Sequence, residues 1–150
     1  NNKNNMATTA QITITSPDLM PGSALNITAN TTLTKAGVTA DLDQKESGVI
    51  KLVSGTEYRL GPLATEMAGD AHDIASYLYV HNKTTEDATY YVDFGIHETM
   101  IGRLYAGDWM FIPWNASDDG AEIEIEPQGG TNIIEYCLFN SDVILPTAAS

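Results

Sequence analysis

The chain has 150 residues and a formal net charge of −13, from 20 acidic against 7 basic residues. This balance argues against binding to nucleic-acid phosphates or to anionic membrane surfaces, which both attract clustered lysine and arginine. The length suits one domain with its own core, and no apolar run approaches the ~20 residues of a membrane helix. Because Cys137 is the single cysteine, the chain has no intrachain disulfide.

The N-terminal region is rich in threonine, alanine and asparagine and has few large apolar residues. Residues 11–15 and 25–30 alternate apolar with polar side chains, so each is a candidate edge strand. The segments 16–18 and 20–22 contain proline and are expected to interrupt regular structure. We therefore expect residues 1–33 to form an extended N-terminal arm.

Residues 1–5 precede Met6 and are almost entirely asparagine. They are either a remnant in front of a natural start at Met6 or a native polar arm, and we leave them out of the fold prediction. The remaining residues, 34–150, are predicted to form the folded domain.

From Gly48 onward, short segments with strand character are separated by turn residues. These segments are residues 49–53, 57–60, 76–82, 90–94, 100–105, 109–114, 121–126 and 134–138. We interpret 100–105 and 109–114 as a hairpin about the turn Ala106-Gly107-Asp108. Eight to ten short strands without an amphipathic helix predict an all-β protein built of antiparallel sheets. Residues 62–73 show no strand pattern and are predicted to be a loop.

Side chains that could carry chemistry are present but show no catalytic or metal-binding spacing. The three histidines (His72, His81 and His97) match no zinc or iron motif. No nucleophile elbow, phosphate loop or dinucleotide fingerprint occurs. Cys137 lies in an apolar run with no basic neighbour, which predicts a buried, inert thiol. We predict no catalytic, cofactor-binding or metal residue, no cofactor, and no enzyme activity.

A row of three glutamates, Glu122, Glu124 and Glu126, alternates with apolar residues late in the chain. Their period of two places them on one face of a strand. Mutual repulsion favours solvation, so we expect this face to point outward.

Most aromatic residues fall between positions 77 and 114, and both tryptophans lie in residues 109–114. In that segment Trp109, Phe111 and Pro113 share one face of the strand, whereas Met110, Ile112 and Trp114 share the other. Two interpretations remain open. The aromatic side chains fill the core and the ends of a sandwich, or one set lies at a subunit interface, where such residues are enriched.

The stretch Leu104-Tyr105-Ala106-Gly107-Asp108, followed by Ile112-Pro113, resembles the second half of a cupin domain. The resemblance implies a jelly-roll barrel. Metal-binding cupins have a histidine soon after that proline and a histidine pair upstream. Here Trp114 to Ser117 follow the proline and His97 stands by itself. The resemblance therefore favours the fold and argues against the metal chemistry.

The half of the chain from Tyr77 to Asn140 resembles small virion proteins of tailed bacteriophages, among them capsid decoration, or cement, proteins. The resemblance rests on the segments Tyr77 to Asn82 and Ile134 to Phe139 and on the turn and Ile-Pro between them. It implies a jelly-roll or sandwich body that is often trimeric. Such a body binds the outside of the shell formed by the major capsid protein.

These observations together predict an antiparallel β-sandwich or jelly roll with an extended N-terminal arm, acting as a capsid decoration protein on the virion exterior. The expected partners are other copies, as a homotrimer, and the major capsid protein, with no nucleic acid or membrane. The expected subunit or capsid interface consists of Trp109, Phe111, Trp114, Tyr105, Ile12, Ile14, Leu25 and Ile27. The alternatives are a cupin-like or lectin-like module for a small molecule or sugar, or another virion component of the tail or fibre.

Overall fold

The computed structural model describes residues 7–34, 42, 44–60, 77–85, 88–114 and 123–140. Every regular element in these ranges is a β-strand, and the sheets are antiparallel and packed together. The ten strands are β1 (Thr8–Met20), β2 (Ser23–Leu33), β3 (Gln44–Leu52), β4 (Tyr58–Leu60), β5 (Tyr77–Asn82), β6 (Tyr91–Ile96), β7 (Thr99–Tyr105), β8 (Trp109–Pro113), β9 (Ile123–Gln128) and β10 (Asn132–Asn140). The predicted all-β sandwich is confirmed.

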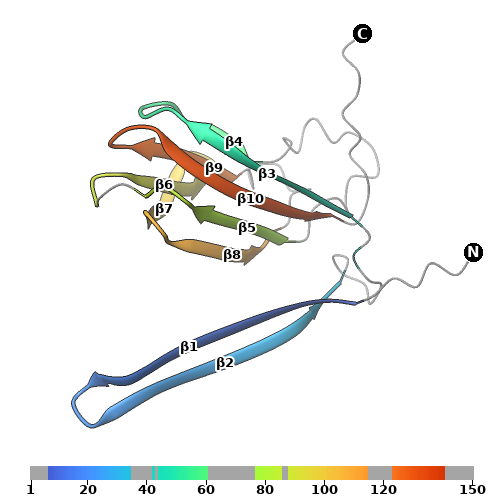
Figure 1. The fold of residues 1–150 in the computed structure, drawn as a ribbon. Coiled ribbons are helices and arrows are strands. Elements are labelled where there is room, and N and C mark those ends of the chain that lie inside the picture. The colour runs from blue at the N-terminus through green and yellow to red at the C-terminus, as the bar shows by residue number, and fades with distance from the viewer. Residues whose placement is uncertain are drawn as a thin grey trace, which may run out of the picture.

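Eight of these strands form two four-stranded sheets (Figure 1). The front sheet has the order β3-β10-β5-β8, and the back sheet has the order β4-β9-β6-β7. The pairs β3–β10, β4–β9, β5–β8 and β6–β7 therefore form one long antiparallel ribbon, rolled so that successive pairs alternate between the sheets. This arrangement is the jelly roll.

Two corners of the rolled ribbon are closed by backbone hydrogen bonds between its two strands. At one corner the Gly55 amide donates to the Pro127 carbonyl oxygen at 3.1 Å. At the other, the Asn82 amide donates to the Asp108 carbonyl at 2.9 Å and the Gly107 amide donates to the Asn82 carbonyl at 2.8 Å. Gly55 and Gly107 have φ angles of 79° and 91°, a left-handed conformation that glycine adopts without steric cost.

The predicted hairpin about Ala106-Gly107-Asp108 is wrong, because β7 and β8 belong to different sheets. Strand β7 pairs with β6 in the back sheet, and β8 pairs with β5 in the front sheet. The turn is a corner that carries the chain across the sandwich. The segments on either side of the Ser54-Gly55 turn, β3 and β4, are divided between the sheets in the same way.

The core lies between the two sheets and is made from alternate residues of both. Its buried members are Leu52, Leu60, Leu78, Val80, Val92, Leu104, Met110, Trp114, Ile123, Ile125, Ile134 and Leu138. Along β8 and the residue that follows it, the alternation places Met110 and Trp114 inside, whereas Trp109 and Pro113 are exposed. The second face of this strand therefore points away from the core.

The prediction that the glutamate row faces solvent is wrong at Glu124, whose side chain is only 2% exposed. Strand β9 lies between β4 and β6, and the turn His97-Glu98 covers this position. One Glu124 carboxylate oxygen accepts the Glu98 amide at 2.6 Å, and the other lies 3.7 Å from Nε of Arg59. Sequence alternation identified the face correctly but could not identify what covers it.

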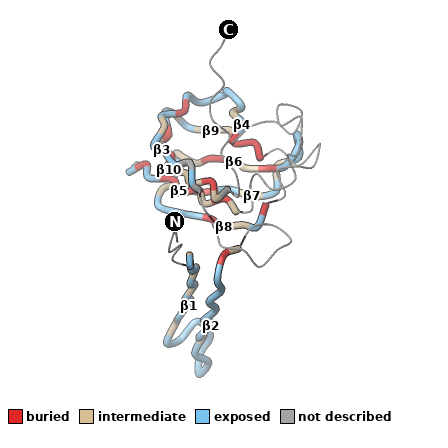
Figure 2. The backbone as a smooth tube through the Cα atoms, turned by 90° about the vertical axis from the view of Figure 1, so that its right-hand side faces the viewer, coloured by how far each residue is buried: buried red, intermediate tan, exposed pale blue. Residues whose placement is uncertain are grey.

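Strands β1 and β2 form a separate two-stranded antiparallel sheet, which we call the N-terminal hairpin (residues 8–33). Figures 1 and 2 both show it projecting from the sandwich. The hairpin turns at Pro21-Gly22, but Pro17 does not end β1. It lies in the register irregularity between Ser16 and Met20, where the missing amide costs no ladder bond.

Several predicted features lie outside the described residues. These are the loop at residues 62–73, His72, Glu122 and residues 1–5.

Candidate assembly surface

The N-terminal hairpin has one apolar and one polar face. Its register pairs Ile12 with Ala29, Ile14 with Ile27 and Ser16 with Leu25, so the apolar side chains gather on one side. The other side carries Gln11, Thr13, Thr15, Asn26, Thr28 and Asn30. This separation follows from the period-two alternation of both strands, combined with a register that matches apolar positions with each other.

Much of the apolar face of the hairpin is open to solvent. Ile14 and Ile27 are 45% and 47% exposed, and Leu19 and Met20 near the tip are each 66% exposed. Only the base of the hairpin is well covered, where Leu33 is 1% exposed. Figure 2 shows β2 pale blue along most of its length and red where it reaches the sandwich, and β1 pale blue with tan stretches.

The outer side of the front sheet is the second apolar surface, which we call the aromatic face (Tyr77, Tyr79, Trp109, Phe111 and Phe139). The rings of Tyr77 and Phe111 stack with centroids 5.5 Å apart, and Phe111 meets Phe139 edge-on at 6.2 Å. Trp109 is 52% exposed at the sheet edge. Cross-strand register explains the cluster, because Tyr77 and Tyr79 on β5 lie opposite Pro113 and Phe111 on β8.

A groove of about 550 Å³ separates the base of the hairpin from the aromatic face. The hairpin contributes residues 8–12, Ala29, Asn30, Thr31 and Leu33 to its lining, and the front sheet contributes Tyr79, Trp109, Phe111 and Phe139. None of these described lining residues is charged. The groove is therefore an uncharged, mainly apolar site in a strongly acidic protein.

The structure brings together most of the residues predicted for an interface, but not all of them. Trp109, Phe111 and Ile12 line the groove. Ile14, Leu25 and Ile27 continue the same face of the hairpin beyond it.

The prediction that Trp114 lies at the interface is wrong, because its side chain is 6% exposed and belongs to the core. It directly follows β8, four residues after Met110, and like Met110 it points inward. Its side chain is not accessible to a partner.

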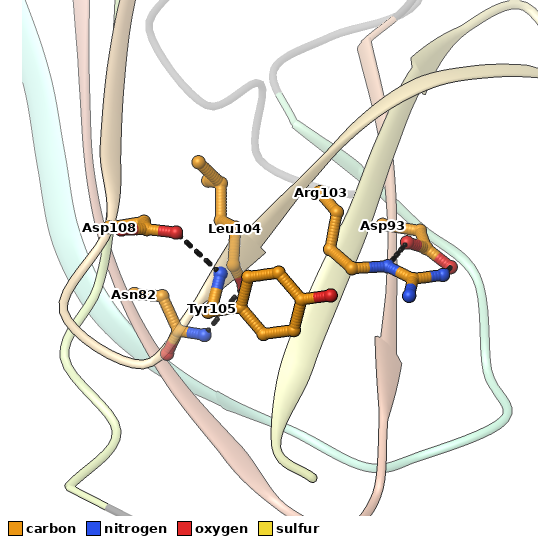
Figure 3. Close-up of polar contacts among 6 residues, drawn as sticks. All are labelled: Asn82, Asp93, Arg103, Leu104, Tyr105 and Asp108. Atoms are coloured by element: carbon orange, nitrogen blue, oxygen red, sulfur yellow. Dashed lines mark hydrogen bonds and ion pairs between the residues drawn. The ribbon is translucent and has the colours of Figure 1, made fainter. Parts of the chain in front are cut away.

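Tyr105 lies in another place, on β7 of the back sheet, where it is 43% exposed. Its ring is 5.6 Å from that of Tyr91, and the guanidinium of Arg103 lies 3.8 Å above the Tyr91 ring. Arg103 also donates from Nε to Asp93 at 2.7 Å (Figure 3). This hydrogen bond raises the pKa of Arg103 above its ordinary value. The cluster is a separate surface on the other sheet, so Tyr105 is not continuous with the groove.

A buried polar network that sequence reasoning missed holds the corner beside β8. Asn82 and Asn132 are fully buried, and Thr84 is 6% exposed. Nδ2 of Asn82 donates to the Leu104 carbonyl at 3.1 Å (Figure 3), and Oγ1 of Thr84 accepts the Ile133 amide at 2.9 Å. The alternation of the sequence could have indicated this network. It places Asn82 on the same side of β5 as Leu78, and Asn132 on the same side of β10 as Ile134.

The side chain of Asn132 completes this network. Its Nδ2 donates to the carbonyls of Gln128 and Gly130, both at 3.1 Å. Because buried polar groups are costly unless they are paired, the network fixes the turn that leads into β10.

Asp108 closes the corner from its exposed side. Its carboxylate accepts the Tyr105 amide at 3.0 Å, and its own amide donates to the Tyr105 carbonyl at 2.9 Å (Figure 3). The corner therefore sets where β8 begins and how it presents Trp109.

Cys137 lies on the outer side of β10, beside the aromatic face, and is half-buried rather than buried in the core. Inward positions of this strand belong to Ile134 and Leu138, so Cys137 has the opposite parity. Burial raises the pKa of its thiol, with Lys45 opposing the effect and Glu135 adding to it. Burial, followed by the charge of Glu135 and a hydrogen bond to it, raises the pKa of Tyr79 as well.

The described histidines do not converge. His81 is on the outer side of β5 with Nδ1 4.0 Å from Glu135, and His97 forms part of the β6–β7 turn. Among the residues that the structure describes, no three His, Cys, Asp or Glu side chains gather as a metal site would require. That part of the chain also contains no helix with the length and apolar character of a membrane span.

No protein-family model matches this chain, and no curated protein sequence is significantly similar to it.

Proposed function

We propose that this protein is a non-enzymatic structural component of a bacteriophage virion. In this role it is a capsid decoration, or cement, protein that binds the outer surface of the major capsid protein shell as a homotrimer. The observation that carries the proposal is the N-terminal hairpin, an amphipathic projection whose apolar face is largely uncovered. An exposed apolar sheet face of this kind is typical of a protein that buries surface on assembly.

The jelly-roll body supports this proposal in a second way. The segments that resemble phage virion proteins, Tyr77 to Asn82 and Ile134 to Phe139, fall in β5 and β10, which pair in the front sheet. The resemblance therefore concentrates on the sheet that carries the aromatic face. A trimer would bind a shell through several weak contacts at once, and effective concentration would multiply their affinities. Acidic surfaces would then meet basic patches of the shell.

The proposal is tested by co-expressing this protein with the major capsid protein encoded in the same genome and purifying the shells. We expect the protein to co-sediment with shells in a fixed ratio and to raise the temperature at which they rupture. Shells that band without the protein would reject the proposal.

A deletion of residues 1–33 tests the role of the hairpin. The sandwich contains all eight strands without it, so the truncated chain is expected to keep its β-type far-ultraviolet circular dichroism while losing assembly or shell binding. If the truncated chain fails to fold, the hairpin is part of the folding unit and its separate role in assembly is rejected.

The groove favours one second candidate, a lectin-like module for a sugar. Its volume is within the range of small-molecule sites, and Tyr79, Trp109 and Phe111 offer rings on which a sugar could stack. Binding on a glycan array that is lost in Trp109→Ala, from a protein that does not bind shells, would favour this candidate.

A further inference from the structure

The N-terminal hairpin is longer than the surface it faces. Its base, from Thr8 to Ile12 on β1 and from Ala29 to Leu33 on β2, lines the groove with the aromatic face. The apolar face continues past the groove through Ile14, Ile27 and Leu25. A two-stranded hairpin without a cover on its apolar face is marginally stable in water, so the distal half requires a surface to pack against.

Charge indicates what that surface is. Asp18 is the one charged residue in residues 8–33, and none of the described groove residues is charged, whereas the whole chain carries −13. Two copies repel each other wherever their acidic surfaces meet. The hairpin and the groove let two copies approach without this repulsion at the contact itself. A strongly basic partner would gain nothing from an uncharged site, so the charge pattern favours a second copy.

The shapes agree with this assignment. The distal hairpin presents an apolar sheet face, and the groove offers the outer face of another sheet. Two such faces pack against each other about 10 Å apart. Trp109 is the most exposed ring of the aromatic face and lies on β8, at the edge of the front sheet. Aromatic side chains in such a position are the usual anchors of protein interfaces.

We propose that the distal half of the N-terminal hairpin from one copy packs into the groove of a second copy, placing Ile14, Leu25 and Ile27 against Trp109 and Phe111. The contact joins two different surfaces, and contacts of this kind form a closed ring, such as the proposed homotrimer, when the rotation between successive copies closes. This inference deepens the self-association part of the proposed function and does not depend on shell binding.

The first test compares two double variants by sedimentation velocity. Ile14→Asp with Ile27→Asp places two charges on the apolar face, and Thr13→Asp with Thr28→Asp places two charges on the polar face. Both pairs are direct cross-strand neighbours, so each variant places two like charges opposite each other on the hairpin. We expect the apolar-face variant to be monomeric, with a dissociation constant raised at least about 100-fold, and the polar-face variant to associate as the parent protein does.

The second test maps the contact in a chain that carries Cys137→Ser. One preparation receives Ile27→Cys and a second, of different mass, receives Trp109→Cys. After mixing and mild oxidation, a disulfide-linked mixed dimer is expected, and replacing Ile27→Cys with Thr28→Cys on the opposite face should abolish it.

Several outcomes would overturn the proposal. One is a parent protein that is monomeric, and another is an equal loss of self-association in the two double variants. A third is cross-linking of Ile27→Cys chains only to each other, which would show that hairpin packs on hairpin. Saturable binding of a soluble oligosaccharide to a monomer, lost in Trp109→Ala, would assign the groove to a sugar. All these measurements use purified protein without shells. A monomer that binds shells would therefore reject this inference and the homotrimer but not shell decoration, and an oligomer that does not bind shells would reject the decoration function alone.

Discussion

At the scale of single residues, two glycines share a backbone conformation but differ in their surroundings. Gly129 and Gly55 have φ angles of 81° and 79°. A Cβ at Gly129 would overlap the backbone oxygen of Thr89, whereas a Cβ at Gly55 would meet nothing within 4 Å. The pair therefore separates the cost of a left-handed backbone from the cost of a close approach.

We expect Gly55→Ala to lower the free energy of unfolding by about 1–2 kcal/mol, because alanine is strained at positive φ. Gly129→Ala should cost clearly more, because the Gly129 turn must also move away from Thr89. Urea denaturation of both variants measures the difference. Equal losses would show that the corner at Gly129 relaxes without cost.

The thiol of Cys137 gives a prediction on pH dependence. Because burial raises its pKa in the folded state, the folded protein favours the neutral thiol, with the charges of Lys45 and Glu135 acting in opposite directions. The resulting stabilisation is present below the ordinary thiol pKa of the unfolded chain, about 8.5, and is lost as pH rises from there through the higher pKa of the folded state.

The raised pKa of Cys137 is tested by following thiolate formation by ultraviolet absorbance as pH rises, with a Cys137→Ser chain as the blank. Lys45→Gln should raise the pKa of Cys137 further, and Glu135→Gln should lower it. Shifts of the same sign in both variants would contradict the assignment of causes.

At the scale of elements, the β6–β7 hairpin forms its two-residue turn from non-glycine residues. His97 and Glu98 have φ angles of 43° and 63°, which is the left-handed geometry that a tight hairpin turn of this kind requires. The buried carboxylate of Glu124 accepts the Glu98 amide and helps to hold this conformation.

Glu98→Gly should therefore raise the free energy of unfolding by about 1 kcal/mol, because glycine removes the strain at positive φ. Glu98→Ala is the matched control, since it removes the same carboxylate but keeps a Cβ. We expect it to leave stability unchanged or lower it slightly. If both variants were equally stable, the strain would be absent and the charge of Glu98 would be the relevant property.

Strands and their faces could be predicted from the sequence, but their partners could not. Alternation in Tyr77 to Asn82 reports which side chains point inward, and the buried Leu78 and Val80 confirm it. The turn at residues 106–108 is short enough for a hairpin, yet β8 pairs with β5, because neighbours in a rolled ribbon are set by packing that no local pattern encodes. The same limit applies to Glu124, which is covered by the β6–β7 turn and contacts Arg59 of β4.

The candidate site was predictable to a similar degree. Alternation along the strand places Trp109 and Phe111 on one side and Met110 and Trp114 on the other. Which of these sides faces the core is decided by the packing of the whole sandwich. The apolar positions of the hairpin, Ile12 and Ile14 among them, could be read from the sequence. The groove could not, because it depends on how the hairpin projects from the body.

At the scale of the whole molecule, the charge of −13 acts against every association between copies. The proposed contact is uncharged, so its own energy depends little on salt, but the bodies that it joins repel each other over long distances at low ionic strength. We therefore expect self-association to tighten as NaCl is raised from about 20 mM to about 500 mM, as screening shortens the range of the repulsion.

Sedimentation equilibrium across this salt series measures the effect, and a charge variant separates screening from other actions of salt. Glu57→Gln with Glu98→Gln removes two exposed carboxylates outside the hairpin and changes the net charge from −13 to −11. Its association should be tighter than that of the parent protein at low salt and should change less across the series, because there is less repulsion to screen. An affinity that falls with salt would instead indicate an interface built from ion pairs, which is incompatible with the packing of an uncharged hairpin into an uncharged groove.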